Sequence, residues 1–299
     1  MNTIDHVICK GAKIPVCIYP NRDDFSCVEK RYHILFVMEG SGSIVYNGHK
    51  ELFVGPLLFC LNEAEIPSLV KGNNLLCRSL YFSPEYVNNK FTFANLRQPS
   101  GDFTLTDIRD RHWFRVFFER SDNYFGRIHI SLAAVGRINK LFDQIEKQLK
   151  MQPDDYWPCR ARSFLIELLF LIEQCWTMED NSSRIFTTGY SEDIDNIILY
   201  LYSNYSSKIS IPELVTKFHM DRTTLTKRFK DEVGDTVINS LIKLRVNLAA
   251  GMLRDTNIPI SEIMYRVGFT DLSYFYKAFK KFTSHNPSEY RQQYSMFYK

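Results

Sequence analysis

Apolar residues between positions 30 and 85 come in short runs separated by Gly, Asn and Pro, a pattern typical of β-strands joined by tight turns. Such runs occupy residues 32–38, 43–46, 51–54, 57–61 and 75–82. The Asn47-Gly48 pair predicts a hairpin, because both central positions of its turn need positive φ angles. Many short strands with this punctuation predict an all-β barrel or jelly roll.

Helical spacing replaces the strand pattern after residue 130. Five apolar residues repeat at intervals of three and four: Val135, Ile138, Phe142, Ile145 and Leu149. This seam has two interpretations, since it can join two copies of the chain as a dimer or pack within the chain's own bundle. A second helix, over residues 161–175, is apolar around much of its circumference, so neighbouring elements must cover it on several sides.

Helix signals in the last third predict a helix-turn-helix unit. Ser210 and Glu213 form a capping box at the start of one helix. After a three-residue break, Asp221 is placed to cap the next helix, whose inward residues are Leu225 and Phe229. A helix, a tight turn and a second helix of this size make a helix-turn-helix unit.

The same unit recurs farther along the chain. Residues 213–218 match residues 262–267 at an offset of 49, and residues 225–230 match residues 275–280 at an offset of 50. One residue has therefore been added in the second turn, around residues 268–270. The match preserves both the apolar face and the basic positions, which indicates an internal repeat.

One long helix, predicted over residues 235–253, joins the two units. Its 19 residues span about 28 Å at 1.5 Å per residue. Recognition helices held apart by a rod of this length can enter successive major-groove segments, which lie roughly 34 Å apart. We therefore expect double-stranded DNA as the partner of this region.

Side chains on the outer face of each recognition helix are the candidate DNA contacts. Base-reading candidates are Arg222, Thr223, Thr226 and Lys227 in the first helix and Leu272, Ser273, Tyr276 and Lys277 in the second. Phosphate candidates are Lys230, Lys280, Lys281 and Arg291. The alternative, that these residues are only the solvated face of a helical bundle, is disfavoured by the repetition of the whole set.

Length, charge and composition add further constraints. A length of 299 residues indicates two domains. From residue 191 on, 15 Lys and Arg stand against 12 Asp and Glu, so this third carries the whole net charge of +3. The seven cysteines form no CxxC pair, which fits reduced thiols in a cytoplasmic protein. We find no signal peptide and no membrane-spanning run, so we expect a cytoplasmic protein without a membrane partner.

The C-terminal third resembles the AraC/XylS family of bacterial transcription activators. Residues 260–269, 273–275, 279–282 and 286–291, the last reading Asn-Pro-Ser-Glu-Tyr-Arg, carry the resemblance. Asp221 stands where the family usually has Ser, and both residues can cap a helix. The resemblance implies a promoter-binding activator that contacts RNA polymerase. It also implies base-reading roles for Thr223, Thr226, Lys227, Leu272, Ser273 and Lys277.

The N-terminal half is similar to the cupin-like sensor domain found in many family members, through residues 32–40, Asn47-Gly48 and 52–61. It departs from that pattern at Pro56 and at residues 62–67. The similarity implies a small-molecule effector inside the barrel. Candidate ligand contacts are Tyr32, Phe36, Met38, Tyr46 and Tyr81, each with core filling as the alternative.

Two other functions remain open. One is a ligand-independent or protein-responsive regulator. The other is a cupin-type enzyme fused to a DNA-binding domain, which would need two or three His and a carboxylate for a metal. His33 and His49 form no close His-x-His pair, and we interpret a lone His in a strand as a hydrogen-bonded structural residue. We therefore expect no catalytic residue, no metal and no cofactor.

The predicted fold is an α+β multidomain chain. Residues 1–130 form the cupin-like β-barrel, and residues 131–180 form a helical linker or dimerisation segment. Residues 181–190 are an interdomain linker. Residues 191–299 form an all-α domain of two helix-turn-helix units joined by a long helix.

Overall fold

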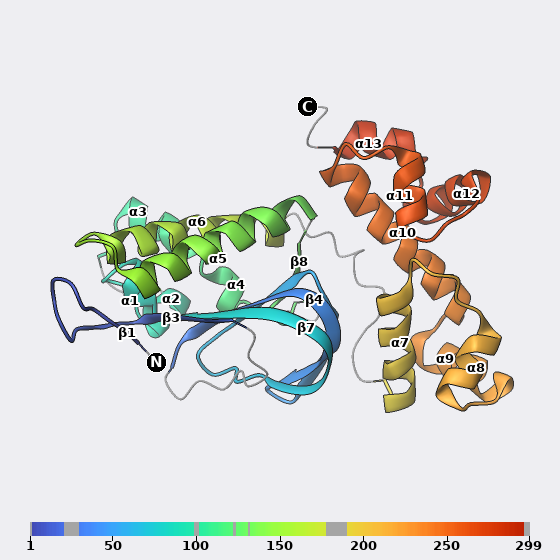
Figure 1. The fold of residues 1–299 in the computed structure, drawn as a ribbon, viewed down its shortest axis with the longest axis horizontal. Coiled ribbons are helices and arrows are strands. Elements are labelled where there is room, and N and C mark those ends of the chain that lie inside the picture. The colour runs from blue at the N-terminus through green and yellow to red at the C-terminus, as the bar shows by residue number, and fades with distance from the viewer. Residues whose placement is uncertain are drawn as a thin grey trace. The chain divides into compact units, whose positions relative to one another are not determined.

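The computed structural model describes residues 2–20, 30–98, 102–121, 124–130, 132–177 and 190–295. The chain divides into two compact units. The first comprises residues 1–49, 55–130 and 134–180, and the second comprises residues 50–54, 131–133 and 181–299. Most of the predicted linker, residues 181–189, lies outside the described residues. Figure 1 shows the helices and strands of each unit.

The β-structure lies in two antiparallel sheets. The strands are β1 (Thr3–Ile4), β2 (Lys13–Ile14), β3 (Val16–Pro20), β4 (Tyr32–Tyr46), β5 (His49–Val54), β6 (Leu57–Leu61), β7 (Ser68–Phe82) and β8 (Arg127–His129). β1 pairs with β2, and the larger sheet has the order β3-β7-β4-β6-β8 with β5 paired to β4. Among the described strands no pairing joins β3 to β8, so the sheet is confirmed and a closed barrel is not found.

The predicted hairpin is confirmed, because Asn47 and Gly48 have φ angles of 50° and 73° between β4 and β5. The runs at 32–38 and 43–46, predicted as two strands, form the single strand β4. Its pairing with β7 shifts register between Val37 and Ser41. Gly40 lies at this irregularity with φ +92°, and a Cβ there would lie 2.4 Å from the Asn74 carbonyl oxygen. Glycine thus lets the strand continue past a close backbone approach.

Six helices follow in the described part of the first unit. They are α1 (Pro84–Val87), α2 (Phe93–Arg97), α3 (Leu105–His112), α4 (Arg115–Phe118), α5 (Leu132–Met151) and α6 (Trp157–Thr177). The two long helices confirm the helical segments predicted at 135–149 and 161–175. None of the described helices is long and apolar enough to cross a bilayer.

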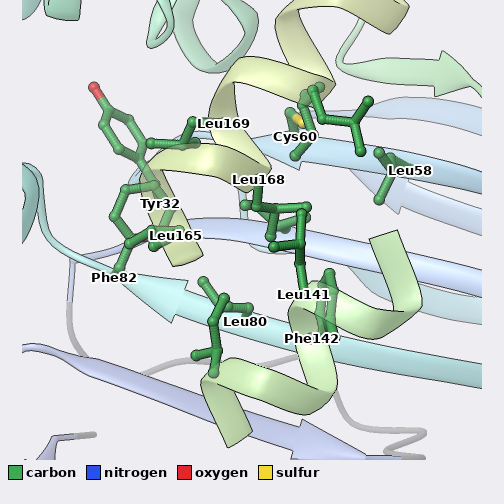
Figure 2. Packing of buried hydrophobic residues seen from close by; sticks show 14 of the residues in the cluster. Tyr32, Leu58, Cys60, Leu80, Phe82, Leu141, Phe142, Leu165, Leu168 and Leu169 are labelled. Carbon is green, nitrogen blue, oxygen red and sulfur yellow. The ribbon is translucent and has the colours of Figure 1, made fainter. Parts of the chain in front are cut away.

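The core of the first unit lies between the sheet and the helices α5 and α6 (Figure 2). Side chains alternate between the faces of a strand, so Tyr32, Leu80 and Phe82 share the face that meets these helices. Leu141 and Phe142 of α5 pack there together with residues of α6. This apolar layer holds the helices on the sheet.

The apolar seam of α5 belongs to this core. Ile138, Phe142 and Ile145 are fully buried, and the ring of Phe142 lies 5.5 Å from that of Phe36. Of the two interpretations of the seam, packing within the chain's own bundle is therefore the one that the structure shows. These side chains pack against the chain's own sheet.

The second unit is helical. Its helices are α7 (Glu192–Asn204), α8 (Ile211–Phe218), α9 (Arg222–Val233), α10 (Val237–Asp255), α11 (Ile260–Arg266), α12 (Leu272–Thr283) and α13 (Pro287–Tyr294). α10 confirms the long helix, which begins and ends two residues later than predicted. It enters two separate cores, the first through Val237 and Leu241 and the second through Val246, Ala249 and Leu253.

We expect Ile145→Ala to lower the free energy of unfolding of the first unit by about 2–5 kcal/mol, because it leaves a cavity in a fully buried layer. All three tryptophans, Trp113, Trp157 and Trp176, lie in this unit, so urea unfolding followed by their fluorescence measures it. Lys147→Ala, on an exposed position of the same helix, is the control and should change stability by at most about 0.5 kcal/mol. Equal loss in both variants would contradict the placement of this seam in the core.

Candidate nucleic-acid interface

The first recognition helix, α9, begins at a side-chain cap. The Asp221 carboxylate accepts a hydrogen bond from the Thr224 amide at 2.9 Å, as the sequence predicts. The hydrogen bonds from Thr224 hold the pKa of Asp221 below its usual value. His219 ends α8 in the left-handed region with φ 52°, which lets the chain turn within three residues.

The second recognition helix, α12, repeats this construction 50 residues later. Asp271 caps it by accepting from the Tyr274 amide at 2.6 Å. Gly268, with φ +86°, has the left-handed conformation that His219 has in the first helix-turn-helix unit, 49 residues earlier. The added residue is therefore Thr270, between the buried Phe269 and the cap. The structure confirms the repeat and locates its one insertion.

The predicted base-reading residues of α9 lie on its outer face. Leu225 and Phe229 are fully buried, whereas all four candidates are exposed: Arg222, Thr223, Thr226 and Lys227. The Thr226 hydroxyl donates to the Arg222 carbonyl oxygen at 2.8 Å, so its methyl group is its more available part. Together these side chains form a polar strip beginning at the helix N-terminus.

The candidates of α12 divide into two kinds. Leu272 is 50% exposed, and Ser273 and Lys277 are exposed as well. Tyr276 is half-buried against the second core, with its hydroxyl 3.5 Å from the Ser288 hydroxyl of α13. Tyr274 is a further exposed residue that was not among the predicted contacts: its side chain is 49% exposed beside Ser273, and it aligns with the exposed Thr224 of α9. The repeat offset of 50 does not identify it, because Thr224 was not among the predicted contacts either.

Charge separates the two sides of α9. Arg228 lies on the inner side and pairs with Asp193 at 2.8 Å and with Glu232. The outer cations of both recognition helices have no carboxylate within ion-pair distance among the described residues: Arg222, Lys227, Lys230, Lys277, Lys280 and Lys281. α12 contains no acidic residue at all. Both helices therefore present uncompensated positive charge, which suits a polyanion.

Arg291 differs from the other phosphate candidates. It is half-buried on α13, and its guanidinium donates to the carbonyl oxygen of Ile258, which precedes α11. Its hydrogen bond therefore ties α13 to the segment between α10 and α11. Lys230, Lys280 and Lys281, in contrast, are exposed.

The five ligand candidates of the first unit do not share one site. Tyr32, Phe36 and Met38 pack in the layer under α5 and α6, where the Tyr32 ring stacks on Phe117 at 4.6 Å. Burial raises the pKa of the Tyr32 phenol. Their position is that of core residues.

Tyr81 and Tyr46 lie elsewhere. Tyr81 points to the other face of the sheet, where its ring stacks on His33 at 4.2 Å, and the Tyr46 hydroxyl donates to the Phe125 carbonyl oxygen at 2.7 Å. His33 is hydrogen-bonded to the Ser79 hydroxyl at 3.0 Å, as expected for a structural histidine. Burial lowers its pKa to about 3, so it is neutral at pH 7. Within the described residues no group of three or more His, Cys, Asp or Glu could hold a metal ion.

We expect Arg291→Met to lower the stability of the second unit by about 1–3 kcal/mol, because it removes a hydrogen bond and leaves the Ile258 carbonyl without this donor. Thermal unfolding followed by far-ultraviolet circular dichroism measures the change. Gln292→Met, at the exposed neighbouring position, is the matched control and should unfold like the parent chain. An unchanged midpoint in Arg291→Met would show that the side chain is free for another role.

Comparison with known proteins finds relatives of the C-terminal domain. The sequence model of a family described as "Helix-turn-helix domain" matches residues 214–293. The uncharacterised HTH-type transcriptional regulator YdiP of Escherichia coli K12 is 33% identical over 34% of this chain and 33% of that protein. The C-terminal domain of AraT, a response regulator from Geobacillus stearothermophilus, is 28% identical over 36% of this chain and 91% of that structure, with a TM-score of 0.36.

A longer similarity includes the first unit. The HTH-type transcriptional activator RhaS of Escherichia coli O81 is 22% identical over 87% of this chain and 85% of that protein. The chain spans less than two thirds of other relatives, namely 33% of YdiP and 60% of a regulator from Pseudoalteromonas carrageenovora. The two capped recognition helices and the long helix that joins them lie in the matched part of the chain. Residues 214–293 of this chain match a helix-turn-helix domain, and the chain is similar to the transcriptional regulators named above.

Proposed function

We propose that this chain is a sequence-specific DNA-binding regulator, acting as an activator, that binds promoter DNA through both helix-turn-helix units at once. The observation that carries the proposal is the pair of recognition helices, α9 and α12, with equivalent caps and equivalent exposed faces. The 19 residues of α10 that join the units span about 28 Å, a length suited to successive major-groove segments.

The exposed side chains divide by the part of DNA that they suit. Arg222, Lys227 and Lys277 can donate to guanine edges, whereas the hydroxyl groups of Thr223 and Ser273 can donate or accept. The apolar candidates for thymine methyl groups are Leu272 and the methyl of Thr226. Lys230, Lys280 and Lys281 suit phosphates, whose contacts give affinity without sequence information.

The proposed role of the first unit is to sense a small molecule as a cupin-like domain. Its support is the second face of the sheet, which is buried yet carries polar side chains, among them His33, Ser79 and Tyr81. Tyr81 and Tyr46 are the ligand candidates that remain away from the helix-covered layer. A regulator that responds to a protein or to no ligand, and a cupin-type enzyme fused to the DNA-binding domain, are the alternatives.

Three further parts of the proposal follow from the regulatory role. An activator in the cytoplasm acts through RNA polymerase, and the relative RhaS is named an activator. A homodimer is also part of the proposal. It would need a surface other than the α5 seam, because Ile138, Phe142 and Ile145 are buried in the chain's own core.

A direct test is selection of bound duplexes from a random DNA pool by the full chain, followed by gel shifts at increasing salt. We expect one recovered sequence with two half-sites and an affinity that falls as salt rises, because bound phosphates release counterions. Absence of salt-dependent binding to any duplex would refute the proposed function.

Lys277→Ala should relax sequence preference at one base pair of the selected site by about 1–3 kcal/mol, because a base-edge contact is lost. Lys281→Ala is the matched comparison on the same helix. It should weaken binding to all sequences alike and reduce the salt slope by about one unit. Equal effects of the two variants on all sequences would remove Lys277 from the base-reading set.

An effector should raise the thermal unfolding midpoint of the full chain, followed by tryptophan fluorescence from the first unit, in a screen of sugars and small metabolites. At a ligand concentration 100 times its Kd, the expected rise is about 5 °C or more. No shift with any compound, together with constant transcriptional activity, would favour the ligand-independent regulator. Stoichiometric metal in the purified chain would favour the enzyme alternative.

A further inference from the structure

The two helix-turn-helix units have separate cores, and α10 enters both. Leu241 is the last buried α10 residue of the first core, and Val246 is the first buried one of the second core. A single helix between two cores leaves the angle between them weakly determined, because it can bend or twist. The residues that bridge this junction therefore decide how α9 is oriented relative to α12.

Arg245, at the middle of α10, makes the first bridge. Its Nε donates to the Tyr205 carbonyl oxygen at 2.7 Å, and one terminal nitrogen donates to the Ser207 carbonyl oxygen at 2.7 Å. Both carbonyls belong to the segment that follows α7 in the first helix-turn-helix unit. The same guanidinium lies 5.8 Å from the ring of Phe269, in the turn of the second helix-turn-helix unit. One rigid, planar group thus touches both units.

Gly268 makes the second bridge. A Cβ at this position would lie 2.6 Å from the Tyr205 carbonyl oxygen and 2.9 Å from that of Ser206. The turn of the second helix-turn-helix unit therefore lies directly against the backbone of the first helix-turn-helix unit. Only glycine allows this approach at φ +86°. Gly268 lies three residues before Asp271, the cap of α12, so any shift here reaches the recognition helix.

The junction is open beside these contacts. A hollow of about 380 Å³ lies there, lined by Ser206, Lys208, Arg245, Tyr265, Phe269 and Thr270 among others. This space is open to solvent, and the contacts of Arg245 and Gly268 beside it restrain one helix-turn-helix unit against the other.

We propose that Arg245 and Gly268 are positioning residues that fix the orientation of α12 relative to α9 and so set the half-site spacing that the protein accepts on DNA. This inference rests on the proposed function and adds its spacing rule. Inserting one base pair moves the second half-site by about 3.4 Å and turns it by about a tenth of a helical turn. A fixed pair of recognition helices cannot follow that displacement, whereas an unclamped pair can.

The test uses the full chain and the duplex recovered by selection, with one base pair inserted or removed between its half-sites. We expect the parent chain to lose about tenfold or more in affinity on either altered duplex. Arg245→Met should bind the altered duplexes within about threefold of the selected one, because the units can then reorient. Gly268→Ala should likewise make the affinity less dependent on half-site spacing or change the spacing that binds best.

Arg254→Met is the matched control, because Arg254 also lies on α10, near its C-terminal end, and pairs with its neighbour Asp255. It should keep the spacing dependence of the parent chain. Circular dichroism verifies that each variant is folded. If Arg245→Met is unfolded, Arg245→Lys replaces it, because lysine keeps the charge but lacks the planar guanidinium that donates to both carbonyl oxygens. Arg245→Lys should show the same loss of dependence on half-site spacing.

The outcomes separate the two proposals. If the parent chain selects no sequence, the proposed function fails. If the parent chain binds specifically and the Arg245 variant loses affinity equally at every spacing, the side chain is merely structural and this inference is wrong, while the proposed function stands. A flattened dependence in the Arg245 variant and not in Arg254→Met supports the inference.

Discussion

The apolar side chains of α10 are divided between two cores, and the DNA-binding half of the chain depends on this division. Each half of the helix completes a unit that could not bury its own apolar face alone, so the units fold around one shared rod. The rod supplies separation but little resistance to twist. Polar contacts at its middle, from Arg245 to the backbone after α7, supply that resistance.

Local signals in the sequence predicted much of this half. Capping boxes, left-handed turns and a 3.6-residue period act over a few residues, so Ser210, Asp221 and the repeat offset could be predicted without tertiary information. The Arg245 bridge could not, because it joins a helix to a segment 38–40 residues away. Tyr276 and Arg291 show the same limit, because Tyr276 contacts Ser288 of α13 and Arg291, on α13 itself, reaches the Ile258 carbonyl oxygen.

In the first unit, the strand and helix patterns predict the elements but not which faces of them pack together. Periodicity located β6 and the Asn47-Gly48 turn, because strand parity and turn geometry are local. It could not show which face of β4 meets α5 and α6, since both faces of that strand are apolar and buried. Tyr32 and Tyr81 were therefore predicted together, although the sheet separates them.

The two left-handed turn positions differ in what mutation can do to them. His219 already carries a side chain, so the first turn accepts other residues that tolerate its φ of 52°. Gly268 has backbone on the side where a Cβ would project. The turn of the first helix-turn-helix unit can therefore accept more substitutions than the turn of the second. A protein built this way can change the DNA sequence bound by its first recognition helix while the position of the second recognition helix is kept.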